Sequence, residues 1–148
     1  MELAHLVGKA GNPFVFQVGQ RHIRQFLQAI GDTNPLYMDE EYAKTTVHGG
    51  IIAPPTFPIA IKPESGEELD LGLDYRRMLH GEQQFIYTRA IRPGDVLHCQ
   101  LKVTDVYERE GKNGKMEFLV LDTEIQDEHG KHVVTSRTNI VYRPLAVK

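Results

Sequence analysis

The stretch IRQFLQAIGDTNPLY, residues 23–37, joins a helical pattern directly to a turn. Its apolar residues Ile23, Phe26, Leu27 and Ile30 follow the i, i+3, i+4, i+7 spacing of one helix face, which predicts an amphipathic helix over 21–30. Gly31 can adopt the left-handed conformation that commonly ends a helix. The Asp, Asn and Pro of the following DTNP favour a tight turn. The segment therefore predicts one amphipathic helix and its stop.

Strand patterns lie on both sides of this helix. Before it, residues 14–18 alternate, with Phe14, Phe16 and Val18 on one face. After it, period-two alternation predicts four strands, at 85–89, 97–104, 116–125 and 133–142. Turn-forming stretches at 92–95, 111–115 and 127–130 separate them. The pattern predicts an α+β fold with about five antiparallel strands.

Between the first and second strands the chain has three further segments. Asp39 can cap a short helix through Ala43. The stretch 49–61 is the most apolar of the chain, and Pro54 and Pro55 stand where a buried helix over 54–62 can begin, since proline is tolerated in a first helical turn. Residues 62–81 are rich in Gly, Glu and Asp and predict a long loop, a length more typical of functional loops than of incidental ones.

Length and composition narrow the function classes. A chain of 148 residues with 41% hydrophobic and 25% charged residues is typical of one globular domain. A net charge of −3 argues against a dedicated nucleic-acid or anionic-membrane binder. The single cysteine, Cys99, excludes an intramolecular disulfide and fits a reducing compartment. Neither a leader pattern nor an apolar run of membrane-spanning length is present, so we expect a cytoplasmic protein that spans no membrane.

The segment 31–37, taken with the helix before it, resembles the motif of the MaoC-like dehydratases and (R)-specific enoyl-CoA hydratases. The similarity extends to GIIAPPTF at 50–57, HGEQQFIY at 80–87 and PGD at 93–95, and it is greatest to the N-terminal, fatty-acid-synthase-type dehydratase branch. The resemblance covers nearly the whole chain. It implies a single hot-dog domain over 1–148, with a five-stranded antiparallel sheet wrapped round a central helix, and no cofactor.

Catalytic members of this family carry the motif Asp-x-Asn-Pro-x-His, whose Asp and His hold the water that is added to, or removed from, an acyl thioester. A carboxylate and an imidazole on one water can orient it and move its proton. Here Asp32 and Asn34 match, but Tyr37 stands at the histidine position. A phenol with a pKa near 10 donates a hydrogen bond at neutral pH and accepts a proton poorly. His48 is a candidate for a displaced base.

A second departure concerns the family's Ile-Ala-His-Gly segment, whose glycine N–H polarises the thioester carbonyl. If Ile52 and Ala53 align with its Ile-Ala, then Pro54 and Pro55 take the His and Gly positions, and proline has no N–H to donate. The resemblance thus implies Asp32, Tyr37 and His48 as catalytic candidates. The candidate substrate-binding residues are Asn34, Gly50, Ile52, Thr56 and Phe57.

Both departures fit a degenerate hot-dog half that contributes to the acyl-chain tunnel while a partner carries the Asp and His. The resemblance therefore implies a subunit of a hydratase or dehydratase acting on enoyl or 3-hydroxyacyl thioesters of CoA or an acyl carrier. Hot-dog domains pair edge to edge, so we expect a homodimer or a heterodimer with a catalytic hot-dog subunit. The alternatives are a non-catalytic acyl-thioester-binding partner subunit and, on the same fold, an acyl-CoA thioesterase.

Each candidate also has a structural interpretation. Asp32 and Asn34 can be turn formers, and Tyr37 can be a packing aromatic with a hydrated hydroxyl. His48 can be a surface-loop histidine, and His80 a strand-end hydrogen-bonding group.

The remaining singled-out residues favour structural roles. Cys99 alternates with leucines and fits a small core residue. His129 and His132 lie in a hairpin turn without further ligands, so we expect no metal site. Four cations are candidates for the phosphates of CoA, although scattered surface cations are common; they are Lys62, Arg76, Arg77 and Arg92.

Overall fold

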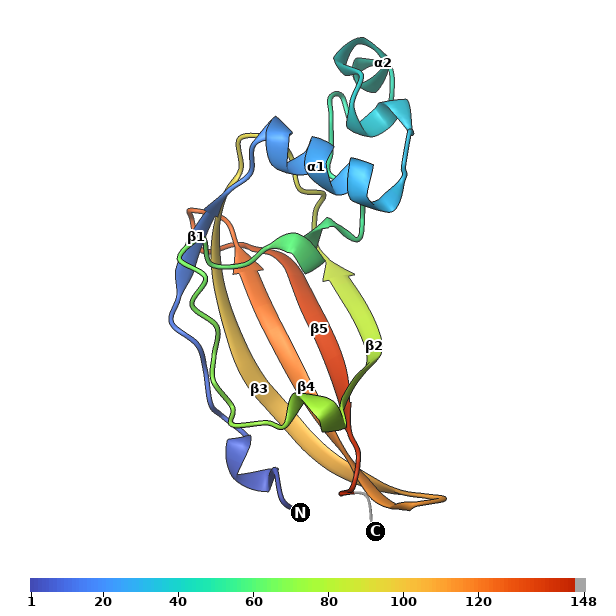
Figure 1. Ribbon diagram of the computed structural model, residues 1–148. Helices are drawn as coiled ribbons and strands as arrows, with labels where there is room; N and C mark the ends of the chain where they lie inside the picture. Colours follow the sequence, from blue (N-terminus) through green and yellow to red (C-terminus); the bar gives the residue numbers. More distant parts are fainter. Residues whose placement is uncertain (146–148) are drawn as a thin grey trace.

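The computed structural model describes residues 1–145 and shows one antiparallel sheet with short helical segments at its upper end and along one face (Figure 1). The sheet order is β1-β3-β4-β5-β2, so β1 and β2 are the edge strands. The strands are β1 (Phe14–Gln17), β2 (Met78–Tyr87), β3 (Val96–Gly111), β4 (Gly114–Gln126) and β5 (His132–Tyr142). The α-helices are α1 (Gln20–Ile30) and α2 (Glu40–Lys44), and the 3-10 turns are η1 (Ala4–Leu6), η2 (Pro35–Tyr37), η3 (Phe57–Ala60) and η4 (Tyr75–Arg77).

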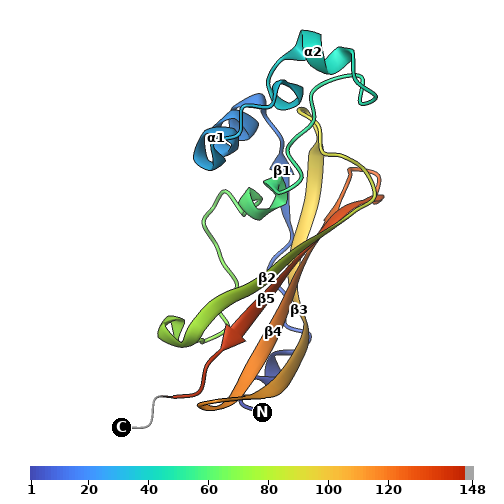
Figure 2. The ribbon, with the colours of Figure 1, turned by 90° about the vertical axis from the view of Figure 1, so that its right-hand side faces the viewer.

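The predicted amphipathic helix is confirmed as α1. It buries Ile23 and Leu27 and ends where Gly31 takes a φ of 69°, the left-handed conformation expected of a C-terminal glycine. With the sheet seen edge-on, α1 and η3 lie on the same side of it (Figure 2). The short second helix is also confirmed, because the Asp39 carboxylate accepts the N–H of Tyr42 at the start of α2.

The five predicted strands are confirmed; the last three extend beyond the predicted bounds, and the second begins earlier than predicted, at Met78, and ends at Tyr87 rather than residue 89. β2 begins at Met78, so the loop predicted to reach residue 81 ends earlier, at η4. The register of β2 on β5 shifts between His80 and Glu82, and Gly81 lies at this bulge. A Cβ at Gly81 would lie 2.9 Å from Cγ2 of Val141, which explains why a glycine fits there.

The buried helix predicted over 54–62 is wrong in type and length. Only the single 3-10 turn η3 forms there. Pro54, Pro55 and Pro58 cannot donate the backbone hydrogen bonds of a continuing α-helix, and each restricts the residue before it. What lies against the sheet at this point is therefore one short turn.

Buried side chains form two separate clusters on the inner face of the sheet. The upper core joins β1, α1, η3 and the upper parts of β3, β4 and β5; it contains Phe16, Val18, Ile23, Leu27, Ala53, Phe57, Ile61, Ile91, Leu97, Cys99, Ile125, Val133 and Val134. The lower core joins η1 to the lower parts of β3, β4 and β5; it contains Leu3, Leu6, Val103, Val106, Leu119 and Tyr142. The two clusters are separate, and the middle of this face lies between them.

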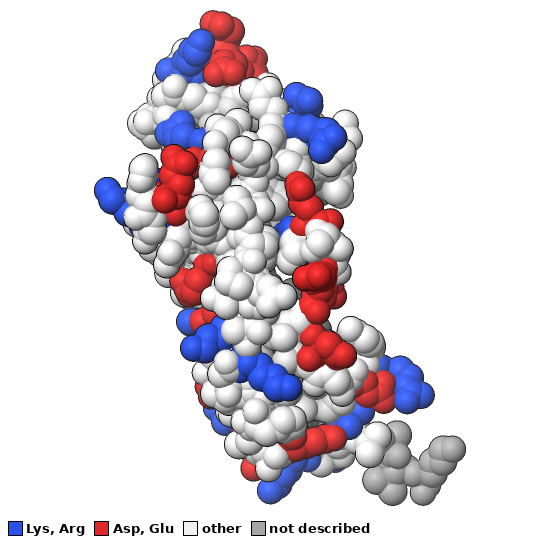
Figure 3. Space-filling view, turned by 90° about the vertical axis from the view of Figure 1, so that its left-hand side faces the viewer, with Lys and Arg blue, Asp and Glu red and all other residues white. Residues whose placement is uncertain are grey.

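Residues 1–145 include no helix whose length and hydropathy would let it cross a membrane. Acidic and basic side chains are mixed on the face shown in Figure 3, with uncharged surface between them.

Candidate functional site

The motif segment at 32–37 folds into two successive side-chain turns. The Asp32 carboxylate accepts the N–H of Asn34 at 2.9 Å, and the Asn34 side-chain oxygen accepts the N–H of Leu36 at 3.0 Å. These bonds lead into η2, where Pro35 fixes the first position. The turn brings Tyr37 back onto the upper core, so Asp32 and Tyr37 lie close to one another.

The phenol of Tyr37 is a poor base in this setting. Partial burial raises the pKa of Tyr37 above its usual value, and the nearby Asp32 carboxylate raises it further. Both effects disfavour the phenolate, so Tyr37 stays protonated at neutral pH. Its hydroxyl can donate a hydrogen bond to water or substrate, but it cannot accept the proton that an imidazole would accept.

His48 lies in the segment held by the loop between β2 and β3. The guanidinium of Arg92 donates to the backbone carbonyl of His48, and the N–H of His48 donates to the Thr46 hydroxyl at 3.2 Å. Gly50 lies beside the same guanidinium, because a Cβ there would be 3.5 Å from Nη1 of Arg92. Within residues 1–145, no hydrogen bond joins the His48 ring to Asp32 or Tyr37, so its role as a displaced base stays a prediction.

The remaining candidate substrate-binding residues lie in different environments. Phe57 is 1% exposed and packs edge-on against Phe16 and Phe26, with ring centroids 6.3 and 5.7 Å away. Ile52 is also buried, whereas Thr56 is exposed at the start of η3. The substrate contacts expected of these residues and of Asn34 stay predictions.

The backbone at 53–57 has few free donors. The Ala53 N–H donates to the Ile91 carbonyl at 2.7 Å, and Pro54 and Pro55 have no N–H at all. The Pro55 carbonyl accepts the Tyr87 hydroxyl at 2.7 Å, and burial raises the pKa of that phenol. This segment is therefore docked on the sheet rather than presenting N–H groups to a thioester carbonyl.

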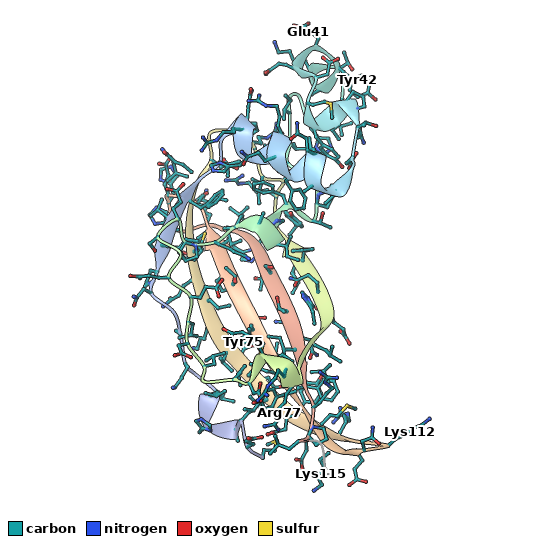
Figure 4. All side chains as sticks on the ribbon, viewed as in Figure 1. Glu41, Tyr42, Tyr75, Arg77, Lys112 and Lys115 are labelled. Atoms are coloured by element: carbon teal, nitrogen blue, oxygen red, sulfur yellow. The ribbon has the colours of Figure 1, made fainter. Side chains whose placement is uncertain are left out.

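A groove of about 930 Å³ opens between the inner face of the sheet and the segment that follows η3. Its walls include Pro58, Ile61, Leu71, Leu73 and Tyr75, and Tyr75 lies in front of the lower half of the sheet (Figure 4). The lining also includes Lys62 and His80. Asp32, Tyr37 and His48 do not line this groove. The candidate catalytic residues and this groove are thus separate features of the chain.

Sequence reasoning missed the floor of this groove. Its polar side chains include Gln83, Thr123, Ser136 and Thr138, in addition to His80 of β2. The Gln83 amide donates to the Ser136 hydroxyl at 3.0 Å and accepts from the Thr138 hydroxyl at 2.8 Å. The available signal was the alternation in β5, where Ser136 and Thr138 fall on the same face as the apolar Val134 and Ile140.

The histidines and the cysteine outside the groove make local contacts. His132 bonds to the hydroxyls of Thr88 and Thr135 at the end of the sheet. Cys99 is buried in the upper core, and burial raises the pKa of its thiol to about 12, which disfavours the reactive thiolate. The part of the chain that the structure describes contains no group of three or more His, Cys, Asp or Glu side chains arranged to hold a metal ion.

Three of the four cations considered for phosphate binding already have protein partners. Arg76 pairs with Asp74, Arg77 pairs with Glu2, and Arg92 donates to the His48 carbonyl. Lys62 lies at the groove. The same lining contains the acidic residues Glu67, Glu68 and Asp70, so the phosphate contact of Lys62 stays a prediction.

Comparison with known proteins places the chain among dehydratase-like proteins. A family model described as the FAS1-like dehydratase domain region matches residues 5–136. A UPF0336 protein from Thermobifida fusca is 42% identical over 135 residues, which cover 88% of this chain and 86% of the relative.

Three solved structures share the fold. The ChsH1–ChsH2 complex from Mycobacterium tuberculosis matches with a TM-score of 0.78 and 20% identity, over 99% of this chain and 90% of the matched one. The C-terminally truncated HadBC (3R-hydroxyacyl-ACP dehydratase) complex from the same organism matches with a TM-score of 0.71 and 22% identity, over 92% of this chain and 96% of the matched one. A MaoC-like dehydratase matches with a TM-score of 0.77 and 24% identity, over 95% of this chain but only 43% of the matched chain. These likenesses confirm the hot-dog fold.

Proposed function

The chain belongs to the family of FAS1-like dehydratase domain regions, and we propose that it is the acyl-binding half of a two-part hydratase or dehydratase. In this proposal the chain binds an enoyl or 3-hydroxyacyl thioester of CoA or an acyl carrier. A second hot-dog subunit supplies the histidine that activates water. The isolated chain then has weak or no activity.

The observation that carries the proposal is the pairing of Asp32 with Tyr37. General acid–base catalysis of hydration needs a group whose pKa lies near the working pH. Burial and the Asp32 carboxylate move the pKa of Tyr37 further from that range. The site therefore keeps a carboxylate and a hydrogen-bond donor that can orient a ligand, without the base that the reaction requires.

The groove supports the acyl-binding part of the proposal. Its volume of about 930 Å³ falls in the range of small-molecule sites, and apolar side chains make up much of its wall. The groove lies next to η3, the single short turn formed by Phe57–Ala60 on this side of the sheet. An acyl chain can occupy the space that a longer central helix would fill.

The exposed edge of the sheet supports the partner part of the proposal. β2 is an edge strand, and its Leu79 and Ile86 are 50% and 40% exposed. An unpaired edge with exposed apolar side chains can pair with a strand of a second subunit. Two of the similar structures are complexes of more than one protein, and in a third the similar region is 43% of a longer chain. A second hot-dog unit, on another chain or from a second copy, fits this edge.

The test measures hydration of crotonyl-CoA and longer enoyl-CoA substrates by the purified chain alone and mixed with a hot-dog protein of the same genome that retains Asp-x-Asn-Pro-x-His. We expect activity only in the mixture. Replacing the histidine of the added subunit should abolish it, whereas Asp32→Asn in this chain should leave most of it.

Two results would overturn the proposal. One is robust hydration by the chain alone that is lost in Asp32→Asn, because this chain would then hold a working acid–base group. The other is release of free thiol from acyl-CoA by the chain alone, which would indicate a thioesterase. Calorimetric titration of the chain with acyl-CoA of several lengths checks the binding function independently of turnover.

A further inference from the structure

We propose that the groove selects an acyl group carrying a hydroxyl or ketone oxygen along its chain, away from the thioester end. This inference rests on the proposed acyl-binding function and adds the substrate class. It comes from the polar band, defined as Gln83, Thr123, Ser136 and Thr138, all of which line the groove.

Strand register places the polar band in two adjacent rows across the sheet. Thr123 pairs with Ser136, and Gln83 pairs with Thr138. Directly paired residues of antiparallel strands point to the same face, so all four side chains project from one face of β4, β5 and β2. The neighbouring row toward the upper core pairs Ile125 with Val134, and the neighbouring row toward the lower core pairs Leu119 with Ile140. The polar band therefore lies between apolar rows of β4 and β5, and on the groove floor itself its apolar neighbours are Leu101, Leu121 and Ile140, with His80 beside Ile140.

The polar band has more donor hydrogens than it uses internally. The amide and the three hydroxyls carry five hydrogens between them, since an amide has two and each hydroxyl one. Two hydrogen bonds join Gln83 to Ser136 and to Thr138. Among residues 1–145 the Thr123 hydroxyl makes no hydrogen bond. Three donor hydrogens therefore remain without an acceptor within the polar band. Their number is the same for either orientation of the Gln83 amide group.

A saturated alkyl chain is a poor occupant of such a floor. It would displace water from the polar band and leave donors unpaired, and each buried unpaired group costs about 1–3 kcal/mol. An acyl chain with one well-placed oxygen can accept from these donors while its apolar parts lie against the apolar side chains of the groove. Sites built to hydrogen-bond a substrate oxygen discriminate strongly against the analogue that lacks it.

The apolar side chains of the groove favour a ligand with hydrocarbon parts over a wholly polar one. Pro58, Ile61, Leu71, Leu73 and Met78 all line the groove together with the polar band. Burial of apolar surface favours the hydrocarbon parts of the ligand against these walls. The complementary ligand is therefore an acyl group with one oxygen between two hydrocarbon segments.

The experiment titrates the full-length chain with dodecanoyl-CoA and with dodecanoyl-CoA bearing one hydroxyl or one ketone at successive positions from mid-chain to the ω end. We expect at least one oxygenated ligand to bind roughly tenfold more tightly than the plain ligand, the ratio that one extra satisfied donor supplies. Thr138→Val and Ser136→Ala should reduce that preference, and plain dodecanoyl-CoA should bind these variants more tightly than it binds the wild type.

Thr104→Val is the matched control, because it removes a hydroxyl from an exposed position of β3 outside the groove lining. It should leave the preference unchanged. If Thr138→Val or Ser136→Ala loses its thermal unfolding transition, Thr123→Val serves in its place, since the Thr123 hydroxyl has no partner among the described residues.

Three outcomes contradict the inference or its premise. Equal affinity for plain and oxygenated dodecanoyl-CoA overturns the inference and leaves the acyl-binding function standing. Free CoA that competes as well as acyl-CoA also overturns it, because the polar band would then bind the pantetheine amides. No binding of any acyl-CoA overturns the proposed function itself.

Discussion

The upper and lower cores lie on one face of the same sheet but are covered by different means. In the upper core, α1 and η3 bring aromatic and aliphatic side chains onto β1 and β3 to β5, and Phe57 meets both Phe16 and Phe26. In the lower core, the cover is the N-terminal turn η1 and the extended chain around Leu71 and Leu73. No helix longer than one turn covers the lower half within residues 1–145.

This difference shows how a groove arises beside a shortened cover. The three prolines of the 54–58 segment limit it to one turn, so the inner face is fully covered only at the top. The N-terminal turn covers the bottom. The polar band lies between the two covers, where a continuous apolar core would have required apolar side chains at Gln83, Ser136 and Thr138.

The largest expected effect is on the upper core. Phe57→Ala removes a ring that is 1% exposed and bridges β1 and α1, so it should lower the free energy of unfolding by about 3–5 kcal/mol. Ile59 belongs to the same turn but is 44% exposed, so Ile59→Ala should cost less than about 1 kcal/mol. Urea denaturation of both variants measures the difference. Equal losses would show that η3 does not anchor the upper core.

The next effect is on the lower core. Leu6→Ala deletes a fully buried side chain of η1 and should cost about 2–4 kcal/mol. Hydrogen exchange should show the added opening in the lower parts of β3 and β4, while α1 stays protected, because the two cores are separate clusters. Val7→Ala, at an exposed neighbouring position, is the control. Equal loss of protection in both halves would mean that the cores unfold as one unit.

A smaller effect is expected at Arg77, which contacts Glu2 near the N-terminus and Tyr142 and Arg143 at the end of β5. Arg77 pairs with Glu2, donates to the Arg143 carbonyl at 2.8 Å and lies 4.1 Å over the Tyr142 ring; it is labelled at the lower end of the sheet in Figure 4. Losing these contacts in Arg77→Ala should cost about 1–2 kcal/mol in urea denaturation. The side chain of Arg76 is 90% exposed, so Arg76→Ala should leave the free energy of unfolding nearly unchanged. A similar cost for both variants would contradict this view of Arg77.

Local sequence patterns predicted the elements that depend on local periodicity. α1 follows from the spacing of Ile23, Phe26, Leu27 and Ile30, and each strand follows from alternation or a run of β-formers. The segment 54–62 was mispredicted because its composition is apolar, as in a buried helix, whereas its backbone is set by three prolines. The apolar composition predicted that this segment is buried, and the lack of backbone N–H donors at its prolines determined its backbone conformation.

The candidate site was predictable only in part, for a related reason. Asp32, Asn34 and Tyr37 are close in sequence, so their turn follows from local chemistry. The polar band joins β2, β4 and β5, and it becomes visible only when the register is known. Ser136 and Thr138 gain their meaning from Gln83, which lies more than 50 residues earlier in the chain. Long-range pairing of this kind has no signature in a single segment.

The smallest expected effect concerns the ion pair that holds the N-terminus over the lower core. The hydrogen bond from Arg77 lowers the pKa of Glu2 from its usual value of 4.5. Because the folded-state pKa is the lower one, the pair stabilises the fold above about pH 4.5, and this contribution is lost as the pH falls through the folded-state pKa. The Glu2 side chain is 55% exposed, so the contribution should be below about 1 kcal/mol and weaker in high salt.

A double-mutant cycle separates the contribution of the Glu2–Arg77 ion pair to the free energy of unfolding from the contributions of other acidic groups. The difference in unfolding free energy between the wild type and Glu2→Gln should be largest near neutral pH and should shrink as the pH falls through the folded-state pKa of Glu2, which lies below 4.5. In the Arg77→Ala background, Glu2→Gln should change nothing at any pH, because the partner is already gone. A difference that persists in that background would mean that Glu2 stabilises the lower core by another contact. The separation of the two cores would then not depend on this ion pair.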